Sequence, residues 1–306
     1  MSIGSPPFLL AHFSDLHATR PAPGRLAELR GKRLLGWLSW RRRRRFEHRD
    51  FVLEALLADL SGQDIGHVVI PGDLTHLGLP SEIEEAAGWL RRIGPPEHVT
   101  LVPGNHDAYG PSAAADPWAP WAAYMTSLRA NGLDVGHERF PFVRRIGPVA
   151  IVGVSSALPT AFWRATGRLG ERQRERLEAI LRALAAEDAF RVLLIHHPPV
   201  PAGQSRRRQL DDAPALRELL ARVGAELVLH GHTHRTAIDH LAGPKDPIPV
   251  VGVPSASSVG TKPARRARYH LYRIEPKRGR RSKVSYEVRG FDPATGRFAH
   301  EAVGEV

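Results

Sequence analysis

Short apolar runs of strand length recur along the chain and alternate with segments of helical periodicity. The strand-like runs cover residues 8–13, 67–70, 99–102, 149–154, 192–195 and 227–229. The helix-like segments between several of them cover residues 51–60, 82–93, 171–186 and 214–223. Continuous apolar strands that alternate with amphipathic helices are typical of sheets buried under helical layers. The pattern therefore predicts a layered α/β fold, and we interpret residues 1–306 as a single domain.

The alternation of strand-like runs and helix-like segments is interrupted at two places. Residues 20–49 separate the first strand from the first helix, where a connection usually takes about 2–6 residues, so we interpret them as an insertion arm. Near the other end, residues 268–274 and 283–288 alternate as half-exposed strands do, with "EPKRGRRSK" as the hairpin loop between them. We therefore expect residues 262–306 to form a β extension.

Basic residues are concentrated in the same two regions. Residues 20–49 and 262–283 each have a formal charge of +9, so the other residues together carry −7 within the total of +11. The chain has no cysteine, which excludes disulfides, thiolate zinc sites and cysteine nucleophiles. It also lacks a basic leader followed by a long apolar run, and no window approaches 18 uninterrupted apolar residues. We expect a soluble, cytoplasmic protein.

Polar residues of the kinds that bind metal ions follow five of the strand-like runs. In open α/β sheets, ligands bind beyond the carboxyl ends of the strands, where segments distant in sequence converge. Side chains two positions apart on an extended chain project to the same side, so a D-x-H or H-x-H pair can bind one centre. The residues are Asp15 and His17 in "SDLH", Asp73 in "PGDLTH", Asn105, His106 and Asp107 in "PGNHDAY", His196 and His197 in "LLIHHPP", and His230, His232 and His234 in "LHGHTHR". Of these, Asp107 and His230 are better explained as residues that orient a neighbour than as ligands.

This set of donors is larger than one metal ion needs. A structural zinc site takes four ligands and is often closed by thiolates, which this chain lacks. Two metal ions fit the set better. They would share a carboxylate, and Asp73 on its Gly-Asp turn is the natural bridge between centres about 3.5–4 Å apart.

The order of these motifs resembles that of the calcineurin-like metallophosphoesterases, whose pattern runs D-x-H, G-D, G-N-H-[DE], H, G-H-x-H. Every block occurs in order between Asp15 and His234. Within that superfamily the pattern is closest to the class III cyclic-nucleotide phosphodiesterases. The resemblance implies a four-layer α/β/β/α metallophosphoesterase sandwich with two metal ions at its rim. Carried over residue by residue, it places Asp15, His17 and His234 on one ion and Asn105, His196 and His232 on the other, with Asp73 bridging.

The resemblance also implies a catalytic residue. His106 would contact the scissile phosphate and the leaving oxygen, a role that suits a side chain whose pKa lies near neutrality. His197 remains an alternative to His196 as the ligand, although strand parity favours His196. The metals stay open, because Mn, Fe and Zn all accept a mixed histidine and carboxylate shell.

We therefore expect a di-metal phosphoesterase that hydrolyses phosphodiesters, or phosphomonoesters, by attack of a metal-activated hydroxide. A cyclic nucleotide is one candidate substrate. A third hypothesis, a non-catalytic membrane- or RNA-binding module on the same scaffold, ranks lowest because none of the ligands is missing. Nucleic acid is not an expected partner, and the sequence leaves the oligomeric state open.

The arm suggests a different substrate. Residues 25–46 combine Trp37, Trp40 and the leucines at 34, 35 and 38 with the arginines of 41–45, as helices at membrane interfaces do. An anionic membrane surface is thus a candidate partner, and a lipid-linked phosphate or pyrophosphate is the alternative substrate, with the protein peripheral at the inner membrane surface. Against this, the related UDP-diacylglucosamine pyrophosphatases typically read G-N-R-D, where this chain has His106. The competing interpretation of the arm is a helix packed on its own domain with a solvated basic end. On either interpretation we expect the arm to be dispensable for small soluble esters.

Overall fold

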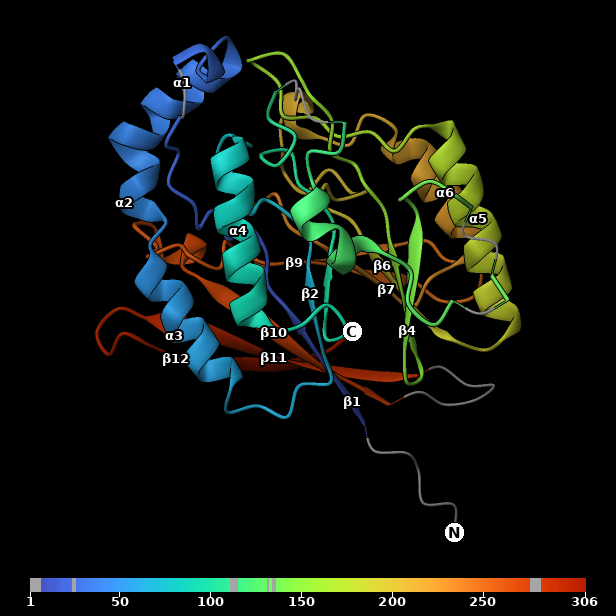
Figure 1. The fold of residues 1–306 in the computed structure, drawn as a ribbon. Coiled ribbons are helices and arrows are strands. Elements are labelled where there is room, and N and C mark those ends of the chain that lie inside the picture. Colours follow the sequence, from blue (N-terminus) through green and yellow to red (C-terminus); the bar gives the residue numbers. More distant parts are fainter. Residues whose placement is uncertain (1–6, 24–25, 111–114, 131, 134–135, 276–281) are drawn as a thin grey trace.

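The computed structural model describes residues 7–23, 26–110, 115–130, 132–133, 136–275 and 282–306. These residues form two six-stranded sheets that lie face to face in the middle of the molecule, with helices on both outer faces (Figure 1). The architecture is the four-layer α/β/β/α sandwich, which confirms the fold that the motifs implied.

The first sheet joins the beginning of the chain to its end, in the order β12-β11-β10-β1-β2-β3. Strands β1, β2 and β3 are parallel neighbours, whereas β10 and β1 are antiparallel, with Phe8 opposite Ile274. Because parallel strands end at the same edge, the loops that follow β1, β2 and β3 lie together. The strands are β1 (Phe8–His12), β2 (His67–Ile70), β3 (Val99–Leu101), β10 (Arg268–Glu275), β11 (Lys283–Asp292) and β12 (Arg297–Glu305).

The second sheet has the order β4-β5-β6-β7-β9-β8, in which β5, β6, β7 and β9 are parallel. Ser14, just after β1, forms a parallel bridge with Ser255, just after β9. The carboxyl edges of the two sheets therefore meet, and the loops of both sheets share one rim. The strands are β4 (Phe142–Ile146), β5 (Val149–Gly153), β6 (Phe190–Leu194), β7 (Leu227–His230), β8 (Ala237–Leu241) and β9 (Ile248–Gly252).

Helices α3 (Asp50–Leu60) and α4 (Pro80–Ile93) cover the first sheet, and α5 (Glu171–Ala186) and α6 (Ala213–Val223) cover the second (Figure 1). One apolar core fills the space between the sheets and under α3 and α4, and another lies between the second sheet and α5 and α6. All four helices begin within two residues of the predicted positions. Of the predicted hairpin loop, residues 276–281 lie outside the described part of the chain, but Glu275 and Lys283 on either side of it are paired.

The insertion arm folds back on the sandwich. Its helical segments are a 3-10 helix (Leu26–Glu28), α1 (Lys32–Ser39), a five-residue π-helical segment (Trp40–Arg44) and α2 (Arg45–Glu47). Gly36 is buried where α1 crosses the loop after β2: a Cβ there would lie 2.5 Å from a methyl carbon of Leu77. Only glycine allows the helix to approach so closely.

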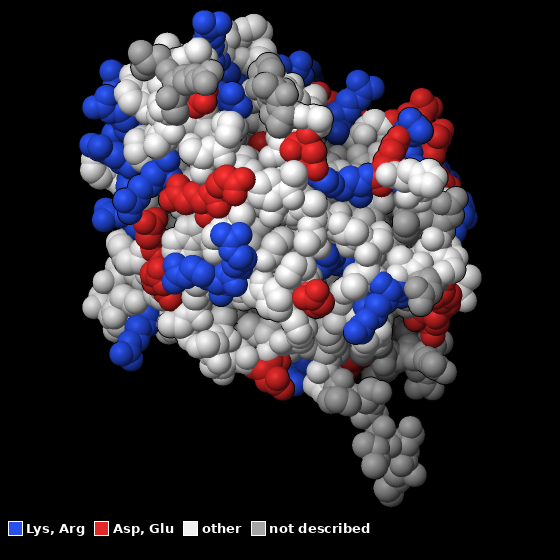
Figure 2. All heavy atoms as spheres, viewed as in Figure 1, with Lys and Arg blue, Asp and Glu red and all other residues white. Residues whose placement is uncertain are grey.

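The outer side of the arm carries much of the positive charge. Figure 2 shows Lys and Arg side chains gathered along the upper left of the molecule, where Figure 1 draws α1 and α2. Arg41, Arg42 and Arg43 are exposed there, whereas Trp37 packs inward against the loop after β2. The arm is thus a packed helix with a solvated basic side. Among the described residues, no helix has the length and apolar character needed to cross a bilayer.

Two buried histidines of the first sheet, His67 on β2 and His270 on β10, predict loss of stability in acid. Burial lowers the pKa of His67 and of His270 to about 3, and each leaves one ring nitrogen without a hydrogen-bond partner. Because both stay neutral when folded and take up a proton near pH 6.5 when unfolded, the free energy of unfolding falls as the pH drops below 6.5, by about 1.4 kcal/mol per pH unit for each histidine.

Urea unfolding between pH 7 and pH 4 tests this. We expect the free energy of unfolding to depend less steeply on pH in His67→Gln and in His270→Gln, each by the equivalent of about one proton. This change in slope is expected whatever the substitution does to stability at pH 7. The exposed His98 provides the control, and His98→Gln should keep the wild-type slope. Parallel curves for all four proteins would contradict the prediction.

Candidate metal centre

The loops at the shared rim bring all eight predicted site residues together. Asp15 and His17 follow β1, Asp73 follows β2, and Asn105 and His106 follow β3. The second sheet contributes His196 after β6, and His232 and His234 after β7. The two aspartates, Asn105, His17 and His196 are buried, and the other three are partly buried.

The first cluster consists of Asp15, His17, Asp73 and His234. Each offers a ligand atom within 4.8 Å of those of the others. His234 Nε2 lies 3.1 Å from Asp15 Oδ1, and His17 Nε2 lies 3.9 Å from Asp73 Oδ2. These are the spacings of atoms that converge on a common point.

The second cluster lies on the other side of Asp73. His196 Nε2 is 3.1 Å from Asn105 Oδ1 and 3.4 Å from Asp73 Oδ2, and the ring centroids of His196 and His232 are 5.0 Å apart. A single carboxylate oxygen, Asp73 Oδ2, therefore faces a histidine from each cluster. This is the geometry that a bridging ligand requires.

Backbone carbonyls fix which nitrogen of His17 and of His196 faces the clusters, whereas at His232 it is Nε2 that donates to a carbonyl, that of Arg208 at 2.8 Å. His17 Nδ1 donates to the carbonyl of Thr75 at 2.8 Å, and His196 Nδ1 donates to that of Pro71 at 2.6 Å. A carbonyl can only accept, so Nδ1 of both rings carries a proton and Nε2 is the nitrogen that faces the site. Metal-ligating histidines are usually oriented in this way.

His197 lies close to the second cluster but is oriented differently. Its Nδ1 is 2.8 Å from the hydroxyl of Ser156 and its Nε2 is 3.3 Å from the carbonyl of Ala165. Both nitrogens therefore have partners outside the cluster. His196 has one nitrogen directed to Asp73 and Asn105, so the geometry favours His196 over His197.

The backbone at these positions is strained. Asp15, His17, Asp73, His232 and His234 all have positive φ, between 43° and 66°. Each such residue costs about 1–2 kcal/mol relative to an ordinary conformation. Strain of this kind collects at functional sites, where the surrounding structure holds it.

Glycines allow the loops to come this close. A Cβ on Gly104 would lie 2.2 Å from Asp73 Oδ1, and one on Gly231 would lie 2.5 Å from Asp15 Oδ2. Both contacts are with carboxylates of the first cluster. Any larger residue at either glycine would displace a predicted ligand.

The electrostatics of the clusters favour cations. Burial opposes the charge on Asp15, but His234 outweighs it and lowers the pKa of Asp15 well below its usual value. Burial likewise opposes protonation of His196, but the carboxylates of Asp73 and Asp15 raise its pKa to about 9. The site thus attracts positive charge strongly. Asp15 Oδ1 is buried, and besides the close approach of His234 Nε2 at 3.1 Å it has no hydrogen-bond partner among the described residues. The other ligand atoms are carboxylate, amide and imidazole atoms, so the residues fit divalent or transition metal ions.

His106 lies beside the first cluster. Its ring centroid is 5.0 Å from that of His17, and its Nδ1 donates to the carbonyl of His76 at 2.6 Å. Its backbone N–H donates to Asp73 Oδ1 at 2.7 Å. The neighbouring Asp107 does not contact the imidazole but accepts backbone N–H groups of Asp73, Thr75 and Gly104, and so ties the loops after β2 and β3 together.

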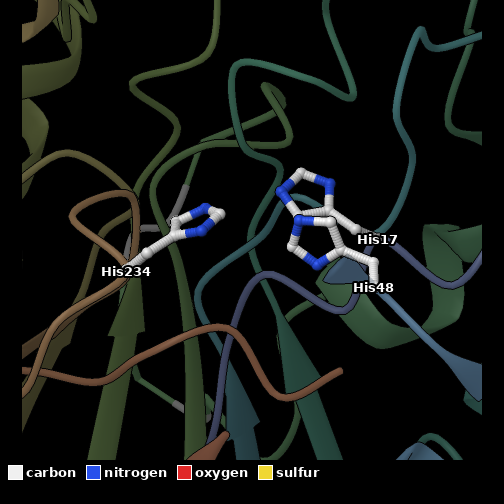
Figure 3. Close-up of side chains that lie close together, drawn as sticks. All are labelled: His17, His48 and His234. Atoms are coloured by element: carbon white, nitrogen blue, oxygen red, sulfur yellow. The ribbon is translucent and has the colours of Figure 1, made fainter. Parts of the chain in front are cut away.

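The structure also places residues of the arm in the site, which the sequence did not predict. Arg44 Nη1 lies 3.3 Å and 3.4 Å from the ring nitrogens of His106, and His48 joins His17 and His234 in a third cluster of ligand atoms (Figure 3). The run of basic residues was visible, but nothing in it distinguished Arg44 from its neighbours. This placement does not support the expectation that the arm is dispensable for small soluble esters.

A pocket of about 330 Å³ opens between the arm and the first cluster. His17, His48 and His76 form part of its wall, and Trp40 from the arm lines it too. Three arginines at positions 20, 45 and 49 also line it. The pocket therefore joins three histidines, among them the predicted ligand His17, to aromatic and basic side chains.

Comparison with known proteins agrees with this geometry. A probable cyclic nucleotide phosphodiesterase from Synechococcus sp. is 23% identical over 235 residues, which cover 76% of this chain and 81% of the relative. The fold is similar to that of a purple acid phosphatase from yellow lupin (Lupinus luteus) seeds, with a TM-score of 0.59 and 14% identity over 98% of this chain. This chain spans about half of the lupin phosphatase, 54% of its length.

A dimetal phosphatase from Danio rerio also shares the fold, with a TM-score of 0.52 and 13% identity over 94% of this chain and 96% of that one. The model of the family described as calcineurin-like phosphoesterase matches residues 8–236, about three quarters of the chain. That match spans every predicted ligand from Asp15 to His234. The chain therefore belongs to the calcineurin-like phosphoesterase family and is a metal-dependent phosphoric ester hydrolase.

Proposed function

We propose that the protein hydrolyses phosphodiesters at a centre of two metal ions, with a cyclic nucleotide as the candidate substrate. The observation that carries the proposal is the position of Asp73 Oδ2, 3.9 Å from His17 Nε2 and 3.4 Å from His196 Nε2. One ion would be held by Asp15, His17 and His234, the other by Asn105, His196 and His232, and both by Asp73. When bound, the two ions supply a nucleophilic water at neutral pH and offset the charge of the phosphate.

His106 is the proposed general acid. Water attacks phosphorus and gives up a proton to the solvent as the new P–O bond forms, and the bond to the leaving oxygen breaks. That oxygen must gain a proton, which protonated His106 can donate from Nε2 while Nδ1–H stays bound to the carbonyl of His76. Burial and the Arg44 guanidinium lower the pKa of His106, and the negative charge of a bound phosphate acts against both.

Arg44 supports a phosphate substrate. Because Nδ1 of His106 carries a proton, only Nε2 of that ring can accept from Arg44. Among the described residues no carboxylate forms an ion pair with Arg44, so its charge is directed into the site without a counter-ion. A phosphate oxygen would supply the missing negative charge.

The pocket supports a nucleotide. Trp40 can stack on a base, and the arginines of the pocket wall can pair with phosphate oxygens. The similarity to a probable cyclic nucleotide phosphodiesterase supports the proposal of a cyclic nucleotide as substrate.

Hydrolysis assays with Mn²⁺ test the proposal. Bis(p-nitrophenyl) phosphate should be cleaved faster than p-nitrophenyl phosphate, and 3′,5′-cyclic nucleotides should give nucleoside monophosphates. Exclusive cleavage of monoesters would reject the diester assignment. A protein that binds two metal ions but cleaves neither compound nor any cyclic nucleotide would favour the alternative below.

A specific surface feature favours a second candidate substrate, a lipid-linked phosphate or pyrophosphate. Leu34 and Leu35 of α1 and the nearby Phe162 and Trp163 are 43–60% exposed. The two pairs are connected, because Lys32 Nζ donates to the hydroxyl of Thr160 at 2.7 Å and to the carbonyl of Arg164 at 3.0 Å. Exposed apolar side chains thus lie close to the basic Lys32 at the start of α1, a combination found on proteins that bind anionic membranes.

Vesicle binding tests this candidate. We expect the wild-type protein to co-sediment with phosphatidylglycerol vesicles, and the triple variant Leu34→Ser, Leu35→Ser, Trp163→Ser to bind at least about tenfold more weakly, because each apolar side chain contributes about 1.5–3 kcal/mol when buried. Val303 on β12 is 72% exposed and provides the control, so Val303→Ser should bind normally. Equal binding by the triple variant would reject the membrane role.

A further inference from the structure

His48 lies at the end of the arm and reaches the metal centre, although no motif of the family contains it. Its ring centroid is 4.6 Å from that of His17 and 5.8 Å from that of His234. A ligand nitrogen of each of these three histidines lies within 4.8 Å of those of the other two. Figure 3 shows the rings of His17 and His48 directed toward that of His234 across a common space.

The protein holds His48 in this place from several sides. His48 forms an antiparallel bridge with Ser258, and Arg49 N–H donates to the carbonyl of Ser257 at 3.0 Å. The preceding Glu47 accepts the hydroxyls of Ser258 and Thr261 at 2.6 and 2.7 Å. The end of the arm is therefore fixed to the loop after β9, and the position of His48 does not depend on a mobile side chain.

Hydrogen bonds also determine which ring nitrogen is available. The hydroxyl of Ser255 donates to the carbonyl of Asp15 at 2.5 Å, so its oxygen can only accept from His48 Nδ1, 3.1 Å away. The hydroxyl of Ser257 lies 2.9 Å from the same Nδ1 and 3.3 Å from Ser255 Oγ, to which it can donate. Nδ1 of His48 therefore carries the proton, and Nε2 keeps its lone pair.

His48 Nε2 makes no hydrogen bond with any residue in the described part of the chain. Its lone pair is therefore available to bind a metal ion. An imidazole with Nδ1 held by a polar partner and Nε2 directed toward other ligand atoms is the usual arrangement of a metal-ligating histidine. His17 has the same arrangement, with Thr75 in place of the serines.

We propose that His48 is a further ligand, through Nε2, of the metal ion that Asp15, His17, Asp73 and His234 hold. The inference rests on the proposed two-metal function. It makes the two ions unequal: the first would have three imidazoles and the second only His196 and His232, together with Asn105. Imidazole ligands favour transition metals over Mg²⁺ or Ca²⁺. The first site should therefore prefer a transition metal ion more strongly than the second site does.

The test measures metal binding rather than activity. Full-length protein is loaded with Co²⁺, and stoichiometry, affinity by chelator competition and the visible spectrum are compared for wild type, His48→Gln and His48→Ala. Loss of a partner that only orients a ligand weakens metal binding about 10–100-fold, so we expect loss of a direct ligand to weaken one of the two ions at least about 100-fold. The spectrum of that ion should change, and the other ion should be unaffected.

Three further variants make the outcome decisive. His48→Asp, which offers a carboxylate, should recover part of the lost affinity, whereas a merely structural role would not be rescued. His240→Gln, at an exposed position on β8, should behave as wild type. If Asp15→Ala loses one ion while both His48→Gln and His48→Ala keep two with wild-type affinity and spectrum, this inference is wrong and the two-metal function stands. A wild-type protein that binds no metal would overturn both.

Discussion

Replacing Asp73 with alanine should abolish most activity and reduce the metal content. Asp73 Oδ2 faces a histidine of each cluster, and Oδ1 accepts the backbone N–H of His106 at 2.7 Å. Loss of this carboxylate removes the bridge between the two ions and releases the loop that holds the proposed general acid. We expect kcat/KM for an aryl phosphodiester with Mn²⁺ to fall at least about 10³-fold, since each lost interaction of several kcal/mol corresponds to orders of magnitude in rate.

Two matched variants separate the roles of Asp73. Asp73→Asn keeps an oxygen that can accept from His106 but removes the bridging charge, so it should be nearly as inactive as the alanine variant. The exposed Asp64→Ala should retain wild-type rate and metal content. An Asp73→Ala protein that binds two ions and hydrolyses the diester at the wild-type rate would eliminate the enzymatic interpretation of the whole centre.

Much of the fold could be predicted because buried strands and amphipathic helices leave clear patterns. Helix α5 (Glu171–Ala186) has the predicted bounds, since its apolar residues recur with helical spacing and Gly170 precedes it. The strands β4, β8 and β9 were not predicted, and β12 was expected only as part of the β extension of residues 262–306, without bounds of its own. Most residues of β12 are exposed, so its sequence shows no alternation of apolar and polar positions. Strand β9 follows β8 after a short loop, without the intervening helix that marks the other parallel strands. Their pairing is decided by neighbours distant in sequence.

The site was predictable for a different reason. Parallel strands bring their following loops to one edge, so the order of D-x-H, G-D, G-N-H-D, H and G-H-x-H was enough to collect residues from Asp15 to His234. The arm offered no such rule. Which way a 30-residue insertion folds depends on contacts such as the burial of Gly36 against Leu77, and local sequence does not encode them. Arg44 and His48 could therefore be found only in the structure.

Replacing His106 should give the second largest effect, and its size should depend on the substrate. A general acid contributes about 10²–10⁴-fold, but only when the leaving oxygen needs a proton. His106→Ala should therefore lose that factor in kcat with a cyclic nucleotide or an alkyl ester. The loss should be far smaller with bis(p-nitrophenyl) phosphate, whose leaving group departs readily as an anion.

Metal content distinguishes this role from a structural one. His106 contacts Asp73 through its backbone N–H, which alanine retains, so His106→Ala should still bind two ions. If its rate falls equally for both substrates, proton donation is not what His106 contributes, and the Arg44–His106 pair would then act in binding the phosphate. If the pair binds the phosphate, KM for the aryl diester should rise in both His106→Ala and Arg44→Gln. If His106 acts as the general acid, His106→Ala should lower kcat for the alkyl ester and leave KM for the aryl diester unchanged.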